Sequence, residues 1–220
     1  MEKSKKVSLY KSIAKRSFET KLNLYVFEMA LESAGDQADL DAERFNKFSI
    51  TPDLVEKYTA EYWQAERTKM IGDKTVDEIY KWMNSYKEKN KSAIELVQAG
   101  YIQNFNQVFT EQDFDWLVEQ KSCFYCGLTI NDVELLAMKR KLFKKNERGW
   151  SLEIDRKNSN LEYSKENCVI SCYWCNNAKT DEFTAEEFAV IGKAIAMVWH
   201  DRLRESNIIG NLSDLIFTKK

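Results

Sequence analysis

The 220-residue sequence contains one proline, seven glycines and one histidine, and it has no long uninterrupted apolar run. The scarcity of proline and glycine argues against a sandwich of many turns and indicates helices joined by short connections. A membrane-spanning helix needs about 20 consecutive apolar residues, so the sequence predicts no membrane partner. The basic N-terminal segment lacks the apolar stretch of a secretory signal, and we therefore expect a cytoplasmic protein.

The net charge of −2 is distributed unevenly along the chain. Residues 1–21 carry a net charge of +5, residues 22–120 carry −9, and residues 121–220 carry +2. Within the last part, residues 139–157 hold eight basic and three acidic side chains. A protein that binds nucleic acid over its whole surface is usually basic throughout, so any such surface here is predicted to be local. The acidic stretch makes direct DNA contact by residues 22–120 improbable.

The composition changes near residue 120, which predicts a helical region over residues 1–120 and a second part over residues 121–220. In the first part, Thr51-Pro52 is a helix start that predicts a helix from Asp53 to about Ile71. Thr75 and Glu78 have the spacing of a capping box, which begins another helix. The helical region is predicted to bind a protein partner or to cover the basic residues of the second part.

In the second part, residues Asn131 to about Lys145 are predicted to form a helix with crowded basic side chains. Trp150 to Ile154 alternate apolar and polar residues, which is typical of a short strand. Val169-Ile170 predicts a second strand that leads into Cys172. Thr184 and Glu187 form a further capping box at the start of a long C-terminal helix.

Four of the five cysteines form two C-x-x-C pairs, Cys123/Cys126 and Cys172/Cys175. This spacing lets two thiolates share one tetrahedral ion, and two such pairs complete a closed zinc site. Two redox dithiols or thiols packed in a core are the alternatives, although paired cysteines in a reducing compartment more often indicate metal. Because four thiolates leave no open coordination position, the predicted zinc is structural, and its binding contributes to folding. Cys168 is predicted to be a small core residue.

Residues 123–188 read CFYCG, then LEIDRKNSN, then ENCVISCYWCNNAK. This stretch resembles the zinc-stapled HNH (ββα-metal) endonucleases, including the recombination endonuclease VII type common in bacteriophages. The resemblance does not extend to residues 1–120. It implies a mainly α fold class, with an N-terminal helical region and a C-terminal four-cysteine zinc ββα-metal (HNH-like) module built on a short two-stranded hairpin. It also implies a bacterial host cytoplasm as the location if the chain is phage-encoded.

In that family the first strand ends with an acidic metal ligand and a general-base histidine, and the following helix begins with a further metal ligand. The resemblance assigns the acidic ligand to Asp155 and the helix ligand to Asn176, with Asn177 as a neighbouring alternative. Asn167 corresponds to the residue that fixes the loop before the second strand. One carboxylate and one amide oxygen suit a hard cation such as Mg²⁺ or Mn²⁺, which keeps several waters.

The sequence departs from the family pattern directly after Asp155, where Arg156 stands in place of the histidine. Arginine stays protonated and cannot serve as an ordinary general base, but it binds phosphate bidentately and stabilises charge in a transition state. The general base must then be another group, and the candidates are a metal-bound water, Glu153 or a residue of the N-terminal half. His200, the single histidine, lies far along the predicted C-terminal helix.

Two functions are consistent with these residues. The first is an HNH endonuclease that cleaves DNA, with Asp155, Arg156 and Asn176 as its catalytic residues and Mg²⁺ or Mn²⁺ as its catalytic metal. The alternative is a catalytically inactive, zinc-stabilised protein on the same scaffold that binds nucleic acid or a protein partner. The side chains predicted to contact nucleic acid are Lys139, Arg140, Lys144, Lys145, Arg156 and Lys179.

Overall fold

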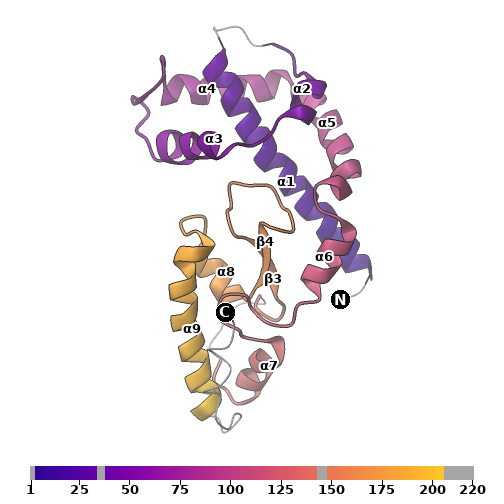
Figure 1. Ribbon diagram of the computed structural model, residues 1–220, viewed down its shortest axis with the longest axis vertical. Helices are drawn as coiled ribbons and strands as arrows, with labels where there is room; N and C mark the ends of the chain where they lie inside the picture. The colour runs from indigo at the N-terminus through magenta and orange to yellow at the C-terminus, as the bar shows by residue number, and fades with distance from the viewer. Residues whose placement is uncertain (1–2, 34–37, 143–147, 206–220) are drawn as a thin grey trace. The chain divides into compact units, whose positions relative to one another are not determined.

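The computed structural model describes residues 3–33, 38–142 and 148–205, whose course is drawn in Figure 1. The chain is mainly helical, and the strands of the described residues form two short antiparallel hairpins. It divides into two compact units, Met1–Glu111 with Ser159–Ser164, and Gln112–Asn158 with Lys165–Lys220. No helix among the described residues is both long enough and apolar enough to cross a membrane.

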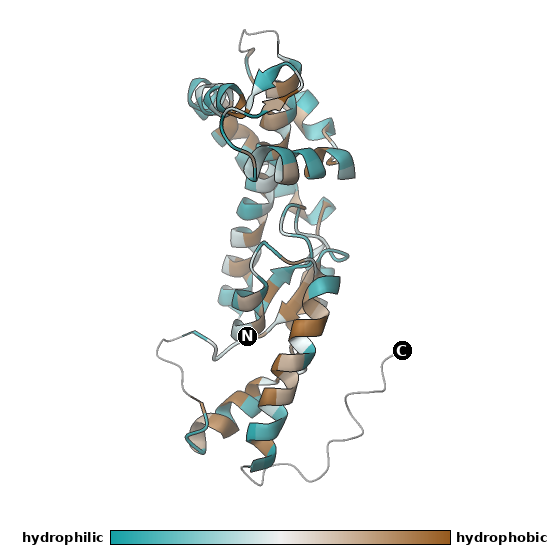
Figure 2. Cartoon of the chain, turned by 90° about the vertical axis from the view of Figure 1, so that its left-hand side faces the viewer, coloured by the Kyte–Doolittle hydropathy of each residue, from teal (hydrophilic) through white to brown (hydrophobic). Residues whose placement is uncertain are grey.

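The first unit is a helical assembly around an aromatic core. Its helices are α1 (Lys3–Glu32), α2 (Ala42–Lys47), α3 (Pro52–Glu56), the π-helix η1 (Lys57–Trp63), α4 (Val76–Lys89), α5 (Lys91–Asn104) and the 3₁₀-helix η2 (Phe105–Gln107). Phe18, Phe27, Phe45 and Tyr86 are fully buried between them. Along the long helices, hydrophobic residues are interspersed with hydrophilic ones (Figure 2).

Segment Ser159–Ser164 belongs to the first unit although it lies between the two strands of the second. The N–H group of Tyr163 donates to Oγ of the buried Ser17 over 3.1 Å. The hydroxyl of Tyr101 donates to the carboxylate of Glu162 and accepts a hydrogen bond from Oγ of Ser17, 3.0 Å away. These hydrogen bonds hold the segment within the first unit.

The predicted helix from Asp53 to Ile71 is wrong in its second half. Thr51 caps α3 as expected, accepting from the N–H of Leu54, but the helical run ends with η1 at Trp63. Strands β1 (Met70–Ile71) and β2 (Lys74–Thr75) then pair through a two-residue loop in which Gly72 has φ +65°. Glycine favours this conformation at the first central position of a tight hairpin turn, so Gly72 belongs to the turn between β1 and β2. The capping box of Thr75 and Glu78 starts α4 as predicted.

The second unit contains the paired cysteines and the second hairpin. Its elements are α6 (Glu111–Val118), which starts at the unit boundary, α7 (Ile130–Met138), β3 (Glu153–Arg156), β4 (Cys168–Ser171), α8 (Tyr173–Lys179) and α9 (Ala185–Glu205). The strands are antiparallel, with Asp155 opposite Val169 and Glu153 opposite Ser171. Helix α8 packs on β3, and α9 packs against both α7 and α8.

Two boundaries in this unit differ from the prediction. The helix expected up to Lys145 ends at Met138, because Arg140 has φ +55° and the N–H groups of Arg140 and Lys141 turn back to the carbonyls of Ala137 and Leu136. This is the Schellman ending of a helix, so the basic residues follow α7 instead of forming its face. The first strand is Glu153–Arg156 rather than Trp150–Ile154, since the strand opposite it sets where pairing begins. The capping box of Thr184 and Glu187 starts α9 as predicted.

Candidate metal centre and catalytic face

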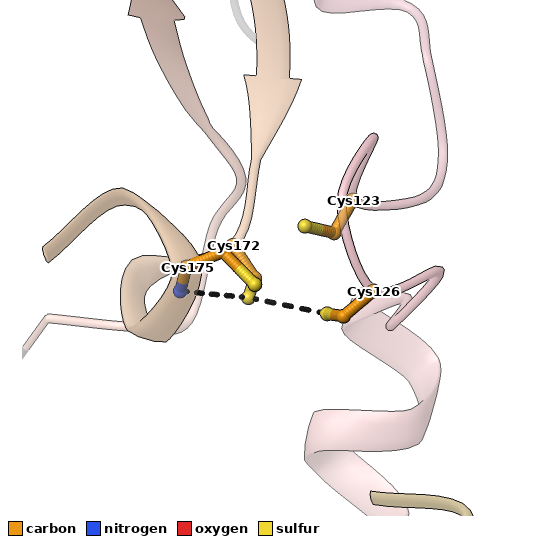
Figure 3. Close-up of side chains that lie close together, drawn as sticks. All are labelled: Cys123, Cys126, Cys172 and Cys175. Atoms are coloured by element: carbon orange, nitrogen blue, oxygen red, sulfur yellow. Dashed lines mark hydrogen bonds between the residues drawn. The ribbon is translucent and has the colours of Figure 1, made fainter. Parts of the chain in front are cut away.

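Four cysteines from two separate segments converge in the second unit. Cys123 and Cys126 lie on the loop before α7, Cys172 follows β4, and Cys175 lies in the first turn of α8, with the sulfur atoms pointing toward one another (Figure 3). All four sulfurs lie within 4.8 Å of one another, and those of Cys126 and Cys172 are 3.7 Å apart. Tetrahedral zinc with ligands at about 2.3 Å places its sulfurs about 3.8 Å apart. The four cysteines can therefore bind a structural metal such as zinc.

Backbone hydrogen bonds hold both cysteine pairs in shape. Gly127 has φ +73°, which closes the first pair so that its N–H donates to the carbonyl of Cys123 over 2.9 Å. The N–H of Phe124 donates to the carbonyl of Ile170 and so connects this loop to β4. In the second pair, the N–H of Cys175 donates to the sulfur of Cys172. These backbone hydrogen bonds help to set the positions of the sulfur atoms in both pairs.

The crowding of the sulfurs shifts their protonation. Hydrogen bonds from the other cysteines, Cys126 first, lower the pKa of Cys123, and the same contacts raise the pKa values of Cys126 and Cys175. Four thiolates at this spacing need a cation between them. Cys168 is buried in β4 and is not a member of the cluster, as the sequence analysis expected.

Asp155 lies on the face of β3 that α8 covers, and two side chains contact it. The hydroxyl of Tyr125 donates to its Oδ2 over 2.7 Å, and Nζ of Lys179 lies 3.6 Å from the same oxygen. Lys179 also donates to the backbone carbonyl of Arg156 over 2.9 Å. Both contacts use Oδ2, and no described residue donates to Oδ1 of Asp155. The carboxylate is therefore oriented and keeps one oxygen for a ligand.

Burial dominates the electrostatics of this residue. Asp155 is 8% exposed, and burial raises its pKa although Tyr125, Lys179 and Arg156 act in the opposite direction. The pKa of Tyr125 is raised by its own burial and by its hydrogen bond to Asp155. A buried carboxylate with these neighbours gains from any further positive charge near its Oδ1.

Asn176 lies one turn before Lys179 on α8 and contacts the other carboxylate of the strand. Its Nδ2 donates to Oε2 of Glu153 over 2.7 Å. Residues 153 and 155 share one face of β3 because side chains alternate along a strand. Nη2 of Arg148 donates to both carboxylate oxygens of Glu153, over 2.8 Å each. The guanidinium of Arg148 also lies over the ring of Tyr173. The amide oxygen of Asn176 receives no hydrogen bond from a described residue.

The remaining predicted residues lie at several places. Arg156 ends β3, and Asn167 exchanges two hydrogen bonds with the backbone of Asn158, which fixes the loop. Lys139 and Arg140 are exposed after α7, whereas Lys144 and Lys145 lie outside the described residues. Lys179, predicted to approach phosphate, is only 1% exposed and neutralises Asp155 instead. His200 lies on α9 beside Asp201.

The sequence did not predict that Tyr125 and Arg148 belong to this face, and it indicated only part of the role of Glu153. Tyr125 lies between two cysteines and gave no sign that it reaches Asp155. Arg148 was counted only within a basic run. Glu153 was considered only as a base, although its position two residues before Asp155 on a strand already indicated a shared face.

No protein-family model matches the chain, and no curated protein matches it significantly. Among solved structures, the chain is similar to the rare-cutting HNH restriction endonuclease PacI, with 31% sequence identity. The match covers 47% of this chain and 75% of that one, with a TM-score of 0.35. At this TM-score the similarity assigns no role to any residue.

Proposed function

We propose that the chain is an HNH-like, metal-dependent nuclease that cleaves phosphodiester bonds in DNA, with β3, β4 and α8 as its ββα-metal module. The observation that carries this proposal is the hydrogen-bond pattern of Asp155 and Asn176. Each side chain is held through one atom, Oδ2 or Nδ2, and keeps its Oδ1 without a donor among the described residues. Two oriented oxygens of this kind are suitable ligands for a hard divalent cation.

In this proposal Asp155 and Asn176 hold Mg²⁺ or Mn²⁺, which when bound polarises the scissile phosphate and stabilises the charge that develops on it. Tyr125 and Lys179 orient Asp155, and Glu153 orients Asn176. Arg156, at the histidine position of the family, binds a phosphate oxygen through its guanidinium. The four cysteines hold one structural zinc ion that fixes α8 against the strands.

The DNA backbone is proposed to follow the basic stretch 139–148. Lys139 and Arg140 are exposed there, and the side chain of Arg148 is 58% exposed. Lys144 and Lys145 belong to the same stretch of sequence. Contacts of this kind neutralise phosphates, so binding is expected to weaken as salt rises.

The test is a cleavage assay on supercoiled and branched DNA with Mg²⁺ or Mn²⁺. We expect cutting that is lost in Asp155→Asn and in Asn176→Ala, while zinc content and circular dichroism stay at wild-type values. Asp155→Asn keeps the shape of the buried side chain and an acceptor for Tyr125, but it also removes the anion beside the buried Lys179. Folding is therefore measured together with cutting. Glu153→Gln, which acts through Asn176, should slow cutting by about 10- to 100-fold.

Asn177→Ala is the matched control. Asn177 is exposed on the same helix and donates to the carbonyl of Tyr173, one turn earlier. It should cut at the wild-type rate. Cutting that survives Asn176→Ala and disappears in Asn177→Ala would contradict the ligand assignment, and wild-type protein that never cuts would contradict the nuclease.

A specific observation favours the second candidate function, a non-cutting nucleic-acid binder. Both carboxylates of the face already have a cation of the protein beside them, Lys179 for Asp155 and Arg148 for Glu153. Such pairing neutralises the face without a metal ion. Salt-sensitive DNA binding without cutting under any divalent cation would select this function.

The setting of the protein is part of the proposal. A phage-encoded protein in a bacterial cytoplasm is consistent with reduced, metal-binding cysteines. The acidic surface of the first unit is proposed to bind a protein partner. Deleting residues 1–118 from a chain that binds DNA tests whether they cover the basic stretch. The affinity for DNA should then change, and an unchanged affinity would contradict this covering role.

A further inference from the structure

The exposed side of the first half of α1 carries positive charge that the nuclease proposal does not use. Between residues 3 and 21 the helix has seven Lys or Arg side chains and one acidic side chain, Glu19. Residues 22–120 of the chain are acidic, with a net charge of −9. Within residues 1–120, an excess of basic over acidic side chains is therefore found in the first half of α1, whereas the remaining residues are acidic overall.

Helix geometry separates these cations from the core. Ile13, Ala14, Ser17 and Phe18 are buried and form the inner side of α1. Lys11, Lys15 and Arg16 are exposed on the opposite side, and we refer to these three residues as the α1 basic face. Lys11 and Lys15 are four residues apart, so they lie on one side of the helix about 6 Å apart along its axis.

The α1 basic face is not neutralised by the protein. No described carboxylate forms an ion pair with Lys11, Lys15 or Arg16. Arg16 donates to Oγ of Ser12, a neutral group on the same helix. Exposed cations without partners retain their attraction for an external polyanion.

We infer that the α1 basic face binds the phosphate backbone of duplex DNA, outside the proposed cleavage site. The choice of DNA over other polyanions rests on the proposed nuclease function. Duplex DNA presents one negative charge per about 1.7 Å of its axis, so cations spaced by one helical turn each meet a phosphate. The helical unit then has a DNA-holding role besides any protein partner.

The experiment measures the salt dependence of duplex binding by the full-length, zinc-loaded chain without added Mg²⁺, so that cleavage cannot interfere. The triple variant Lys11→Gln, Lys15→Gln, Arg16→Gln should reduce the slope of log affinity against log salt by about 2.7. Between 50 and 200 mM salt, the wild-type chain should then lose about 40-fold more affinity than the variant.

The matched control neutralises three exposed lysines elsewhere in the same unit, Lys57→Gln, Lys69→Gln and Lys91→Gln. It changes the net charge of the chain by the same amount. A slope that falls in the first variant and stays at the wild-type value in the control supports the inference. Equal slopes in all three proteins overturn it, as does an equal fall in both variants, which would reflect net charge alone.

A further experiment measures binding of the wild-type chain and the triple variant to vesicles with anionic phosphatidylserine headgroups. If the triple variant loses vesicle binding while its DNA slope is unchanged, the face serves a membrane surface and the DNA assignment is overturned. The cleavage assay remains independent of these outcomes. If the wild-type chain never cuts but the triple variant has a reduced salt slope, the nuclease proposal is refuted and the DNA-binding inference stands. If the wild-type chain cuts and the triple variant has an unchanged salt slope, the nuclease proposal stands and the inference is refuted.

Discussion

Asp155 is a buried charge whose environment is built by two other residues. Tyr125 reaches it from the loop of the first cysteine pair, and Lys179 reaches it from the end of α8. Removing one partner of a buried ion pair costs more than the pair itself contributes, because the remaining charge stays desolvated. The same two partners that orient a candidate metal ligand therefore also stabilise the second unit.

We predict that Lys179→Met destabilises the second unit by about 3 kcal/mol, because it leaves Asp155 without a cation and the carbonyl of Arg156 without its donor. Urea unfolding of the zinc-loaded protein measures this change. The double variant Lys179→Met, Asp155→Asn should recover part of the loss. Lys193→Met on the exposed side of α9 is the control and should stay within about 0.5 kcal/mol of wild type. Equal stabilities for Lys179→Met and the control would contradict the prediction.

At this scale the sequence could indicate the candidate ligand residues but not the side chains that hold them. Asp155 and Asn176 were found by their place in a motif that can be read along the chain. Tyr125 and Arg148 could not be found that way, since their partners depend on how a loop closes onto β3. A hydrogen bond between residues 125 and 155 follows from tertiary packing, which no local pattern records.

Among the elements, α9 approaches the first cysteine pair unusually closely. Gly192 is buried, and a Cβ atom at this position would lie 2.8 Å from the backbone oxygen of Tyr125 and 2.9 Å from its Cβ. Neither atom can move without shifting the loop between Cys123 and Cys126. The glycine is thus required by the contact of α9 with the candidate zinc loop and not by the conformation of the helix.

We predict that Gly192→Ala destabilises the second unit by about 1–3 kcal/mol, because the added methyl group overlaps the loop. This loss exceeds the gain of up to about 1 kcal/mol that alanine brings to a helix. Gly100→Ala in α5 is the matched control, since nothing lies within 4 Å of its Cβ, and it should be neutral or stabilising. Urea unfolding and zinc affinity are the measurements. A Gly192→Ala protein as stable as Gly100→Ala would refute the packing argument.

Predictions about elements succeeded where the signal was local. The capping boxes of Thr75 with Glu78 and Thr184 with Glu187 were read correctly, because both partners lie within one helical turn. The ends of helices were read less well. The ending after α7 depends on Arg140 in a left-handed conformation that glycine usually adopts, so no residue of that stretch signalled it.

For the whole molecule, the two units have separate hydrophobic cores, and all four clustered cysteines belong to the second. The sequence predicted a change of character near residue 120 from composition alone. It could not predict that Ser159–Ser164 returns to the first unit, because that assignment depends on contacts with Ser17 and Tyr101, distant in sequence. Because the cores are separate, we expect the units to respond differently to loss of metal.

We predict that Cys123→Ser with Cys172→Ser abolishes zinc binding and unfolds the second unit while α1, α4 and α5 stay folded. Structural zinc contributes on the order of 10 kcal/mol, comparable to the whole stability of a domain. Metal analysis should find one zinc ion per wild-type chain and none in the variant, and hydrogen exchange should report loss of protection in α7, α8 and α9 of the second unit while α1, α4 and α5 of the first unit keep theirs. Cys168→Ala, a buried cysteine outside the cluster, is the control and should keep its zinc. Retained protection of α8 and α9 in the zinc-free variant would show that the core of the second unit folds without the metal.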